Sequence, residues 1–310
     1  MPATKGAVAV LVLAASVSPQ ADREATSLLG APLAPPPIPA ERRKALEENL
    51  AMARDVYARN PGSADALVWL ARRTAYLGRY REAIQILTDG IASHPQDARM
   101  YRHRGHRYIT VREFDNAAAD LSRAVALVAG RPDEVEPDGQ PNARNIPTST
   151  LHTNIYYHLG LAHYLRGDLE AALAAYRECH RLSTNPDMLV AAAHWLYMTL
   201  RRLDRPGEAH AVLEPVTREM EIIENGSYHR LLLLYKGLEQ ADGLMASVAE
   251  GGLDAVTIGY GVANWHLYNG RPQLALPLFR RIVERHAAEW PAFGYIAAEA
   301  ELARQRKQEP

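Results

Sequence analysis

The chain has 310 residues, of which 47% are hydrophobic and 23% charged, so its composition is that of a globular protein with a sizeable core. Its formal net charge of -1 provides no general electrostatic attraction to nucleic acid or to anionic lipid. The single cysteine, Cys179, excludes an internal disulfide and any cysteine-based zinc site.

The N-terminal residues have the pattern of a secretory signal peptide. Residues 1–18 contain one lysine, then an apolar run from Ala7 to Val17 that includes small residues near its end. The run is too short to cross a bilayer as a mature helix. We therefore expect a cleaved signal and a mature chain, periplasmic or secreted, that has no membrane span. Residues 19–39 include the run APLAPPPIP, which predicts an extended proline-rich linker.

From residue 40 the pattern becomes helical. Leu46, Leu50 and Ala53 recur at spacings of three and four, which predicts one amphipathic helix that precedes the repeats. Residues 64–95 then form two short amphipathic helices joined by a tight turn at Gly78. A near copy follows about 34 residues later, which is the period of a helix-turn-helix repeat.

Further copies follow, with one interruption. The third copy carries Tyr156, Leu159, Gly160 and His163, and looser copies continue to a last helix at about 291–304, which we expect to cover the end of the array. Between the second and third copies lies an acidic, proline-rich insert at 129–150. It is either a surface loop or a flap over a groove. We expect its acidic side chains to be solvated rather than to bind calcium.

These copies resemble the tetratricopeptide repeat, with its pattern W-x2-L-G-x2-Y … A-x3-F … P. Two residues depart from the pattern, because Arg104 stands where leucine is usual and Arg112 where the turn glycine is usual. The resemblance implies an all-α, right-handed superhelical solenoid of antiparallel helix pairs at residues 40–305, with about six repeats and capping helices. It further implies a bacterial protein- or peptide-binding scaffold rather than an enzyme, with no cofactor.

In such repeats the first helices line a concave groove. The residues predicted to face it are rich in Arg, His and Tyr and include no acid, so we expect an acidic protein or peptide partner and no nucleic acid. The predicted groove residues are Arg72, Arg102, His106, Tyr157, Tyr164, His194, Met198, Arg201, Tyr260 and Asn264.

Two other readings of the sequence remain open. His103 and His106 are three residues apart on one helix and could share a metal, so the chain could be an enzyme or a metal-dependent small-molecule binder that also uses the acidic insert. It could instead be a structural component of envelope assembly. No catalytic motif completes the first alternative, and no catalytic or metal-binding residue is assigned. Cys179 is expected to be a packed thiol.

Overall fold

The computed structural model describes residues 23–248 and 251–308, which contain fourteen α-helices, one 3₁₀-helix and one two-stranded sheet. The repeats are α2 (Ala64–Tyr76) with α3 (Tyr80–Ser93), α4 (Ala98–Thr110) with α5 (Phe114–Val128), α6 (Leu151–Arg166) with α7 (Leu169–Leu182), α8 (Pro186–Arg202) with α9 (Pro206–Leu213), α10 (Gly226–Tyr235) with α11 (Ala241–Ser247), and α12 (Leu253–Tyr268) with α13 (Pro272–Arg285). Before them lie β1 (Ala25–Thr26), β2 (Pro32–Leu33) and α1 (Ala40–Arg59), and after them η1 (Ala287–Glu289) and α14 (Phe293–Gln308). The predicted all-α solenoid of helix pairs is confirmed.

Local sequence decides where the repeats begin. The side chains of Ser63, Asp97, Thr150 and Asn185 each accept a hydrogen bond from a backbone N–H in the first turn of the helix that follows. These caps satisfy donors that have no partner inside the helix. At the other end of α6, Gly167 adopts a left-handed conformation with φ of 90°, which terminates the helix and lets the chain reverse into α7.

Small residues allow the two helices of a repeat to approach closely. A Cβ added at Gly105 on α4 would lie 2.7 Å from Leu121 on α5. A Cβ added at Gly160 on α6 would lie 2.7 Å from the ring of Tyr176 on α7. Because a methyl group has no room at either site, the glycines set the spacing of these pairs.

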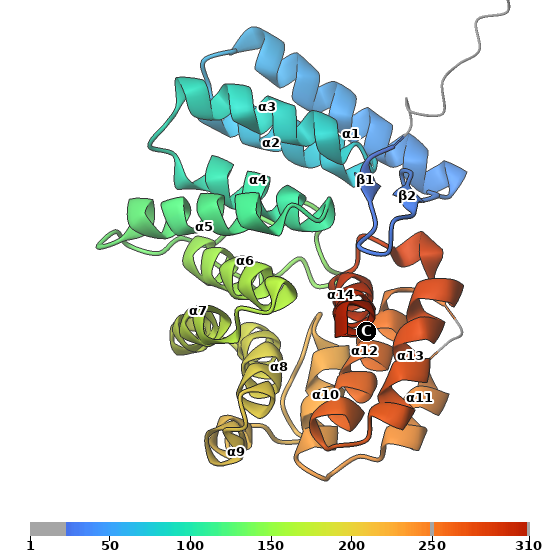
Figure 1. Cartoon of the computed structure of the whole chain (residues 1–310). Coiled ribbons are helices and arrows are strands. Elements are labelled where there is room, and N and C mark those ends of the chain that lie inside the picture. Colours follow the sequence, from blue (N-terminus) through green and yellow to red (C-terminus); the bar gives the residue numbers. More distant parts are fainter. Residues whose placement is uncertain (1–22, 249–250, 309–310) are drawn as a thin grey trace, which may run out of the picture.

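The pairs stack in sequence order and curve round, so that α1–α3 and the C-terminal helices lie at the two ends of an arc (Figure 1). Each first helix from α2 to α12 contacts the first helix of the next pair, which makes these helices the inner layer. The fifth pair is irregular. Helix α10 packs mainly on α8 and α12, and α11 packs on α12.

The last helix enters the hollow of the arc instead of only covering its end. Helix α14 contacts α12, α13 and α6, and its residues 295–301 are buried on every side. Two of the buried side chains are acidic. Glu299 pairs with Arg112 at 2.8 Å, and Glu301 pairs with Arg202 at 2.7 Å. The sequence predicted that this helix covers the end of the array. It lies inside the hollow as well, where arginines on α8 and on the α4–α5 turn pair with its acidic side chains.

Described residues of the proline-rich segment dock onto the repeats. Strands β1 and β2 pair antiparallel, and Ala25 and Leu33 are buried in the main core. Arg81 on α3 donates a hydrogen bond from its Nε to the carbonyl oxygen of Glu24, and Trp290 donates one from its indole nitrogen to the carbonyl oxygen of Ala34. Residues 23–39 therefore connect the two ends of the arc, where the sequence predicted an extended linker. The predicted signal at residues 1–18 lies outside the described residues.

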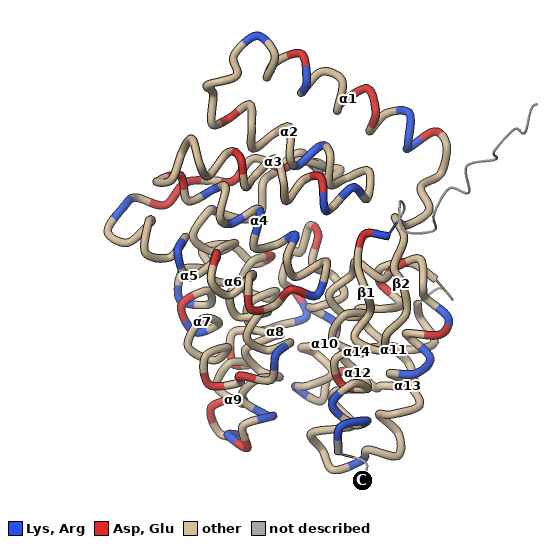
Figure 2. Tube along the Cα trace, turned by 45° about the horizontal axis from the view of Figure 1, so that its top comes forward, with Lys and Arg blue, Asp and Glu red and all other residues tan. Residues whose placement is uncertain are grey.

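Charge is distributed evenly over the fold. Basic and acidic residues are both spread along the trace (Figure 2), in keeping with the net charge of -1. Within the residues that the structure describes, none of the helices has both the length and the apolar character needed to cross a membrane.

Candidate functional site

The insert at 129–150 crosses the inner side of the first repeats. Its Asp133 carboxylate accepts a hydrogen bond from the Thr150 hydroxyl at 2.7 Å and one from the His152 backbone N–H at 3.0 Å, at the start of α6. Further along, the carbonyl oxygens of Pro137 and Gly139 accept hydrogen bonds from arginines of α2. The insert is therefore packed against the first helix of the first repeat.

Beneath the insert lies a cavity of about 120 Å³, which we call the basic recess. The residues that line it are Ala71, Arg72, Ala75 and Tyr76 of α2, Leu87 of α3, Arg102, His103, His106 and Arg107 of α4, and Glu136 of the insert. The repeat explains why the basic residues meet, because Arg72 and His106 are 34 residues apart and so occupy equivalent positions on successive first helices. Arg102 lies one turn before His106 on the same face of α4.

The basic recess has more positive than negative charge. The Nε of Arg102 lies 3.0 Å from a carboxylate oxygen of Glu136, and Arg102 also contacts the ring Nδ1 of His103 at 3.0 Å. Since a guanidinium only donates, Nδ1 accepts and the imidazole proton lies on Nε2, which faces Glu136 at 3.7 Å. Among the described residues, neither Arg72 nor Arg107 has a carboxylate within ion-pair distance.

Burial controls the protonation of these groups. It lowers the pKa of His103 and His106 well below 6.5, and the neighbouring arginines lower it further, so both rings are neutral at pH near 7. Burial also lowers the pKa of Arg107 to about 10, which still leaves the guanidinium charged at that pH. The formal charge of the recess is therefore that of three guanidinium groups, Arg72, Arg102 and Arg107, and one carboxylate.

A second cavity of about 380 Å³ adjoins the recess, and His106 lines both. We call it the aromatic cavity. It lies among α6, α8, α10, α12 and the start of α14, and its lining includes Tyr157, His158, Tyr228 and Phe293. The rings of His106 and His158 lie 4.3 Å apart, and that of Phe293 lies 5.4 Å from His106. Its volume is in the range of pockets that hold ligands.

Hydrogen bonds hold the walls of the aromatic cavity in place. The hydroxyl of Tyr157 accepts a hydrogen bond from the indole nitrogen of Trp195 at 2.9 Å and lies 3.1 Å from the hydroxyl of Tyr228. The carboxylate of Asp187, buried in the first turn of α8, accepts three backbone N–H groups from residues 223–225. The segment that leads into α10 is thereby fixed against α8.

Four of the ten predicted groove residues come together here. Arg72 and Arg102 line the basic recess, Tyr157 lines the aromatic cavity, and His106 lines both. Arg201 lies elsewhere on α8, where its guanidinium covers the ring of Tyr268 at 4.7 Å.

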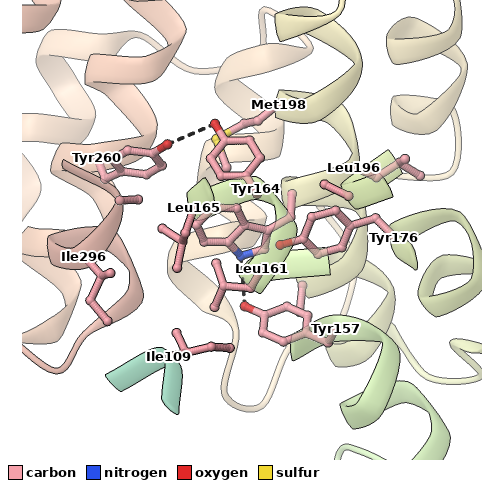
Figure 3. Close-up of a cluster of buried hydrophobic side chains, with 14 of the residues drawn as sticks. Ile109, Tyr157, Leu161, Tyr164, Leu165, Tyr176, Leu196, Met198, Tyr260 and Ile296 are labelled. Atoms are coloured by element: carbon pink, nitrogen blue, oxygen red, sulfur yellow. Dashed lines mark hydrogen bonds between the residues drawn. The ribbon is translucent and has the colours of Figure 1, made fainter. Parts of the chain in front are cut away.

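The other five predicted groove residues are part of the core. They are Tyr164, His194, Met198, Tyr260 and Asn264, and all are fully or almost fully buried. Tyr164 accepts hydrogen bonds from Tyr260 and Asn264 at 2.9 and 3.0 Å, and Met198 and Ile296 lie in the same cluster (Figure 3). The groove predicted at these positions is filled by their own packing and by α14, so they line neither cavity.

Several lining residues could not be recognised in the sequence. Glu136 was expected to be solvated with the other acids of the insert, yet it is 9% exposed and paired with Arg102. The residue spacing of the repeats does not predict this contact. It also does not predict that Phe293 lines the cavity, because Phe293 reaches it only through the entry of α14 into the hollow. Arg107 follows His106 directly in the sequence and also lines the recess, and its guanidinium lies 5.7 Å from the centre of the Tyr80 ring.

The alternative metal site has unfavourable surroundings. His103 is engaged by Arg102, and the three arginines around it repel a cation. In the described part of the chain, no three His, Cys, Asp or Glu side chains are grouped so as to hold a metal ion. Cys179 is buried and contacts the carbonyl oxygen of Thr153 at 3.4 Å. It is a packed thiol, as predicted.

Comparison with known families agrees with the helix pairs. Family models of the tetratricopeptide repeat match residues 43–104 and residues 153–186. The chain carries tetratricopeptide repeats. The first match covers most of α1, all of α2 and α3, and half of α4, whereas the second covers most of α6 and all of α7. Tetratricopeptide repeats stack into solenoids whose concave surfaces serve for binding, and the helix pairs of this chain have that architecture.

Individual proteins are similar to the chain only distantly. BBSome complex member BBS4 from Bos taurus is 24% identical over 155 residues, which is 50% of this chain and 26% of that protein. The crystal structure of YrrB, a TPR protein with an unusual peptide-binding site, has a TM-score of 0.43 at 13% identity and covers 83% of this chain and 97% of its own. A tetratricopeptide repeat protein from Parabacteroides merdae has a TM-score of 0.48 at 11% identity, covering 81% and 92%.

Proposed function

We propose that this protein is a scaffold of the bacterial cell envelope or periplasm that binds an acidic, extended segment of a partner protein. The binding surface is formed by the basic recess and the aromatic cavity, which meet at His106. The protein acts by holding its partner and catalyses no reaction.

The observation that carries this proposal is the charge imbalance of the basic recess. Three guanidinium groups surround a space that contains a single carboxylate. Arginine presents its donors in a planar fork that matches a carboxylate, and such charge-assisted hydrogen bonds are stronger than neutral ones. Partial burial strengthens them further, because water screens them less. An acidic side chain is therefore the ligand group that complements the recess.

The aromatic cavity suggests what accompanies the acid. Tyr157, Tyr228 and Phe293 present ring surface, and Leu253 and Met188 add apolar contact. An apolar or aromatic side chain fits such a lining. A segment in which an acidic and an apolar residue are close neighbours can use both cavities at once.

A binding measurement with matched peptides tests the proposal. Two pools of short peptides are compared by fluorescence anisotropy, one rich in Glu and aromatic residues and one with Gln in place of every Glu. The Glu pool is expected to bind, and Arg107→Gln should weaken it about tenfold or more, because a hydrogen bond to a charged group contributes about 1.5–3 kcal/mol. Equal binding of the two pools would refute an acidic partner.

The control for that variant is Arg123→Gln. Arg123 is exposed on α5 of the same repeat as Arg107, and it lines neither cavity. The Arg123→Gln substitution changes the net charge by the same amount as Arg107→Gln and is expected to leave the affinity for the Glu pool unchanged. A similar loss with both variants would mean that only the overall charge of the protein matters.

The location in the envelope is supported by residues 1–18 alone. Mass spectrometry of the N-terminus, on protein isolated from fractionated native cells, is expected to find the mature chain outside the cytoplasm without these residues. Recovery of chains that still begin at Met1 in the cytoplasmic fraction would refute this part of the proposal.

A further inference from the structure

This inference rests on the proposed function and names the regulation of the same site. We propose that Glu136 occupies the subsite that receives a carboxylate of the partner, and that residues 133–148 are an internal competitor which an acidic segment must displace.

Glu136 is held in the manner of a ligand side chain. It enters the basic recess from a loop whose neighbouring residues remain in solvent, with Val135 61% exposed and Glu136 9% exposed. Besides its ion pair with Arg102, its carboxylate accepts a hydrogen bond from the amide of Asn154 on α6 at 3.1 Å. Glu136 and, at the far end of the insert, Thr148 are thus buried side chains that anchor a largely exposed stretch.

The adjoining contacts of the insert with α2 use its backbone, whereas the side chain of Gln140 accepts a hydrogen bond from Arg42 on α1. Arg72 donates a hydrogen bond to the carbonyl oxygen of Pro137 at 2.8 Å, and Arg73 donates one to that of Gly139 at 2.7 Å. Any extended peptide has carbonyl groups at such intervals. A partner segment can therefore replace the contacts with Arg102 and Arg72 if it carries an acid at the position of Glu136. It needs a glycine at the position of Gly139, because an added Cβ there would collide with the hydroxyl of Tyr76.

Charge and packing favour the exchange. Glu136 brings one carboxylate to three guanidinium groups, so a segment with two acids neutralises more of the recess than the insert does. The insert has little apolar anchorage of its own, since Val135 and Ile146 are both exposed. Its ends are secured by Asp133 and by the hydrogen bond from Thr148 to Glu224. Its middle is also held by exposed contacts, such as the ion pair of Arg144 with Glu221, and these must break for the middle to leave while α6 keeps its cap.

The test uses a labelled synthetic peptide with the sequence of residues 132–141, PDEVEPDGQP, added to the full chain. Wild-type protein is expected to bind it weakly, because the subsite is occupied. Glu136→Gln in the protein should bind it at least about tenfold more tightly, because the internal carboxylate no longer competes. A peptide that carries Gln in place of its own Glu136 should bind no form of the protein well.

The matched control is Glu134→Gln, which alters a neighbouring exposed acid of the same insert. It should bind the peptide as weakly as wild type. Equal affinity of the wild-type, Glu134→Gln and Glu136→Gln proteins for the peptide would overturn the inference. If the Glu-rich pool nevertheless binds wild type in a manner that depends on Arg107, the proposed function stands without the internal competitor.

Hydrogen exchange on the wild-type chain provides a second readout that does not depend on the variant folding. Saturation with the Glu-rich pool is expected to increase amide exchange in residues 135–147 and to decrease it in α2 and α4. Peptide binding that leaves exchange in the insert unchanged would overturn the inference, because the insert would then have stayed in place.

Discussion

The ion pair between Arg112 and Glu299 is one of two buried ion pairs that hold α14 in the hollow of the arc. Arg112 lies in the turn between α4 and α5 with φ of 69°, where a glycine is usual. Its guanidinium donates hydrogen bonds to Glu299 at 2.8 Å and to the carbonyl oxygens of Thr110 and Trp290 at 2.6 and 2.9 Å. Both charged side chains are almost completely buried. We predict that Glu299→Gln, which removes the charge and keeps the shape, substantially destabilises the protein.

The expected magnitude follows from the geometry. At 2.8 Å and an effective dielectric constant of about 20, the two charges attract each other by about 6 kcal/mol. Burial of both charges offsets much of this energy, so the intact pair contributes little net stability. Removal of one charge leaves the other buried without a counter-ion, which costs about 3–5 kcal/mol. Arg112→Gly should cost a similar amount, reduced by about 1 kcal/mol because glycine accepts the left-handed conformation.

Urea unfolding followed by circular dichroism measures the change in the free energy of unfolding. Hydrogen exchange of the α14 amides is measured in parallel, because a repeat array can unfold in parts and α14 could be released before the rest unfolds. The double variant should cost less than the sum of the single ones by about 2–3 kcal/mol. Glu208→Gln is the reference, since Glu208 pairs with Arg177 on the exposed surface, where water screens the pair, and its loss should cost much less. If Glu299→Gln costs no more than Glu208→Gln, the buried pair does not hold α14.

Three further predictions concern the core behind the cavities. Burial lowers the pKa of His194 to about 3, whereas a histidine in the unfolded chain has a pKa near 6.5. As the pH falls from about 7 to 5, only the unfolded chain takes up this proton. The free energy of unfolding therefore falls by about 2 kcal/mol. Urea titrations should show that His194→Gln removes this part of the loss, whereas the exposed His210→Gln keeps it. Gly160→Ala should lower stability by about 1–3 kcal/mol in the same assay, because its methyl group meets a ring on the facing helix, whereas Gly207→Ala, which meets nothing, should not. Cys179 should resist alkylation in the native protein, because burial raises the pKa of its thiol and keeps the reagent away from it. It should react fully in denaturant. Rapid labelling of the native protein would contradict its burial.

A small part of the candidate site could be anticipated from the repeat register. Arg72 and His106 are equivalent positions on successive first helices, and Arg102 lies on the same face one turn earlier. The helix period and the repeat length place these residues on the face of the inner layer, and both can be read from a short stretch of sequence. The prediction therefore holds where neighbouring repeats alone form the wall.

The departures from the repeat pattern were visible in the sequence, but their reasons were not. Arg104 stands at a leucine position because it forms a two-point ion pair with Asp120 on α5, with N···O distances of 2.7 and 2.8 Å. Arg112 stands at a glycine position because it binds Glu299, which is 187 residues away. An unusual residue indicates a special contact, whereas its partner is known only once the chain is folded.

What the sequence by itself determined is the succession of helices, their caps and turns, the spacing of the pairs through Gly105 and Gly160, and the limits of the insert. These depend on contacts within about one repeat, which recur in the pattern. Only the tertiary structure decided that α14 fills the hollow and buries residues such as Tyr164 and Asn264, and that Glu136 enters the basic recess. The physical reason is that such contacts join parts of the chain outside the repeat period, and their formation depends on the curvature that all the pairs create together.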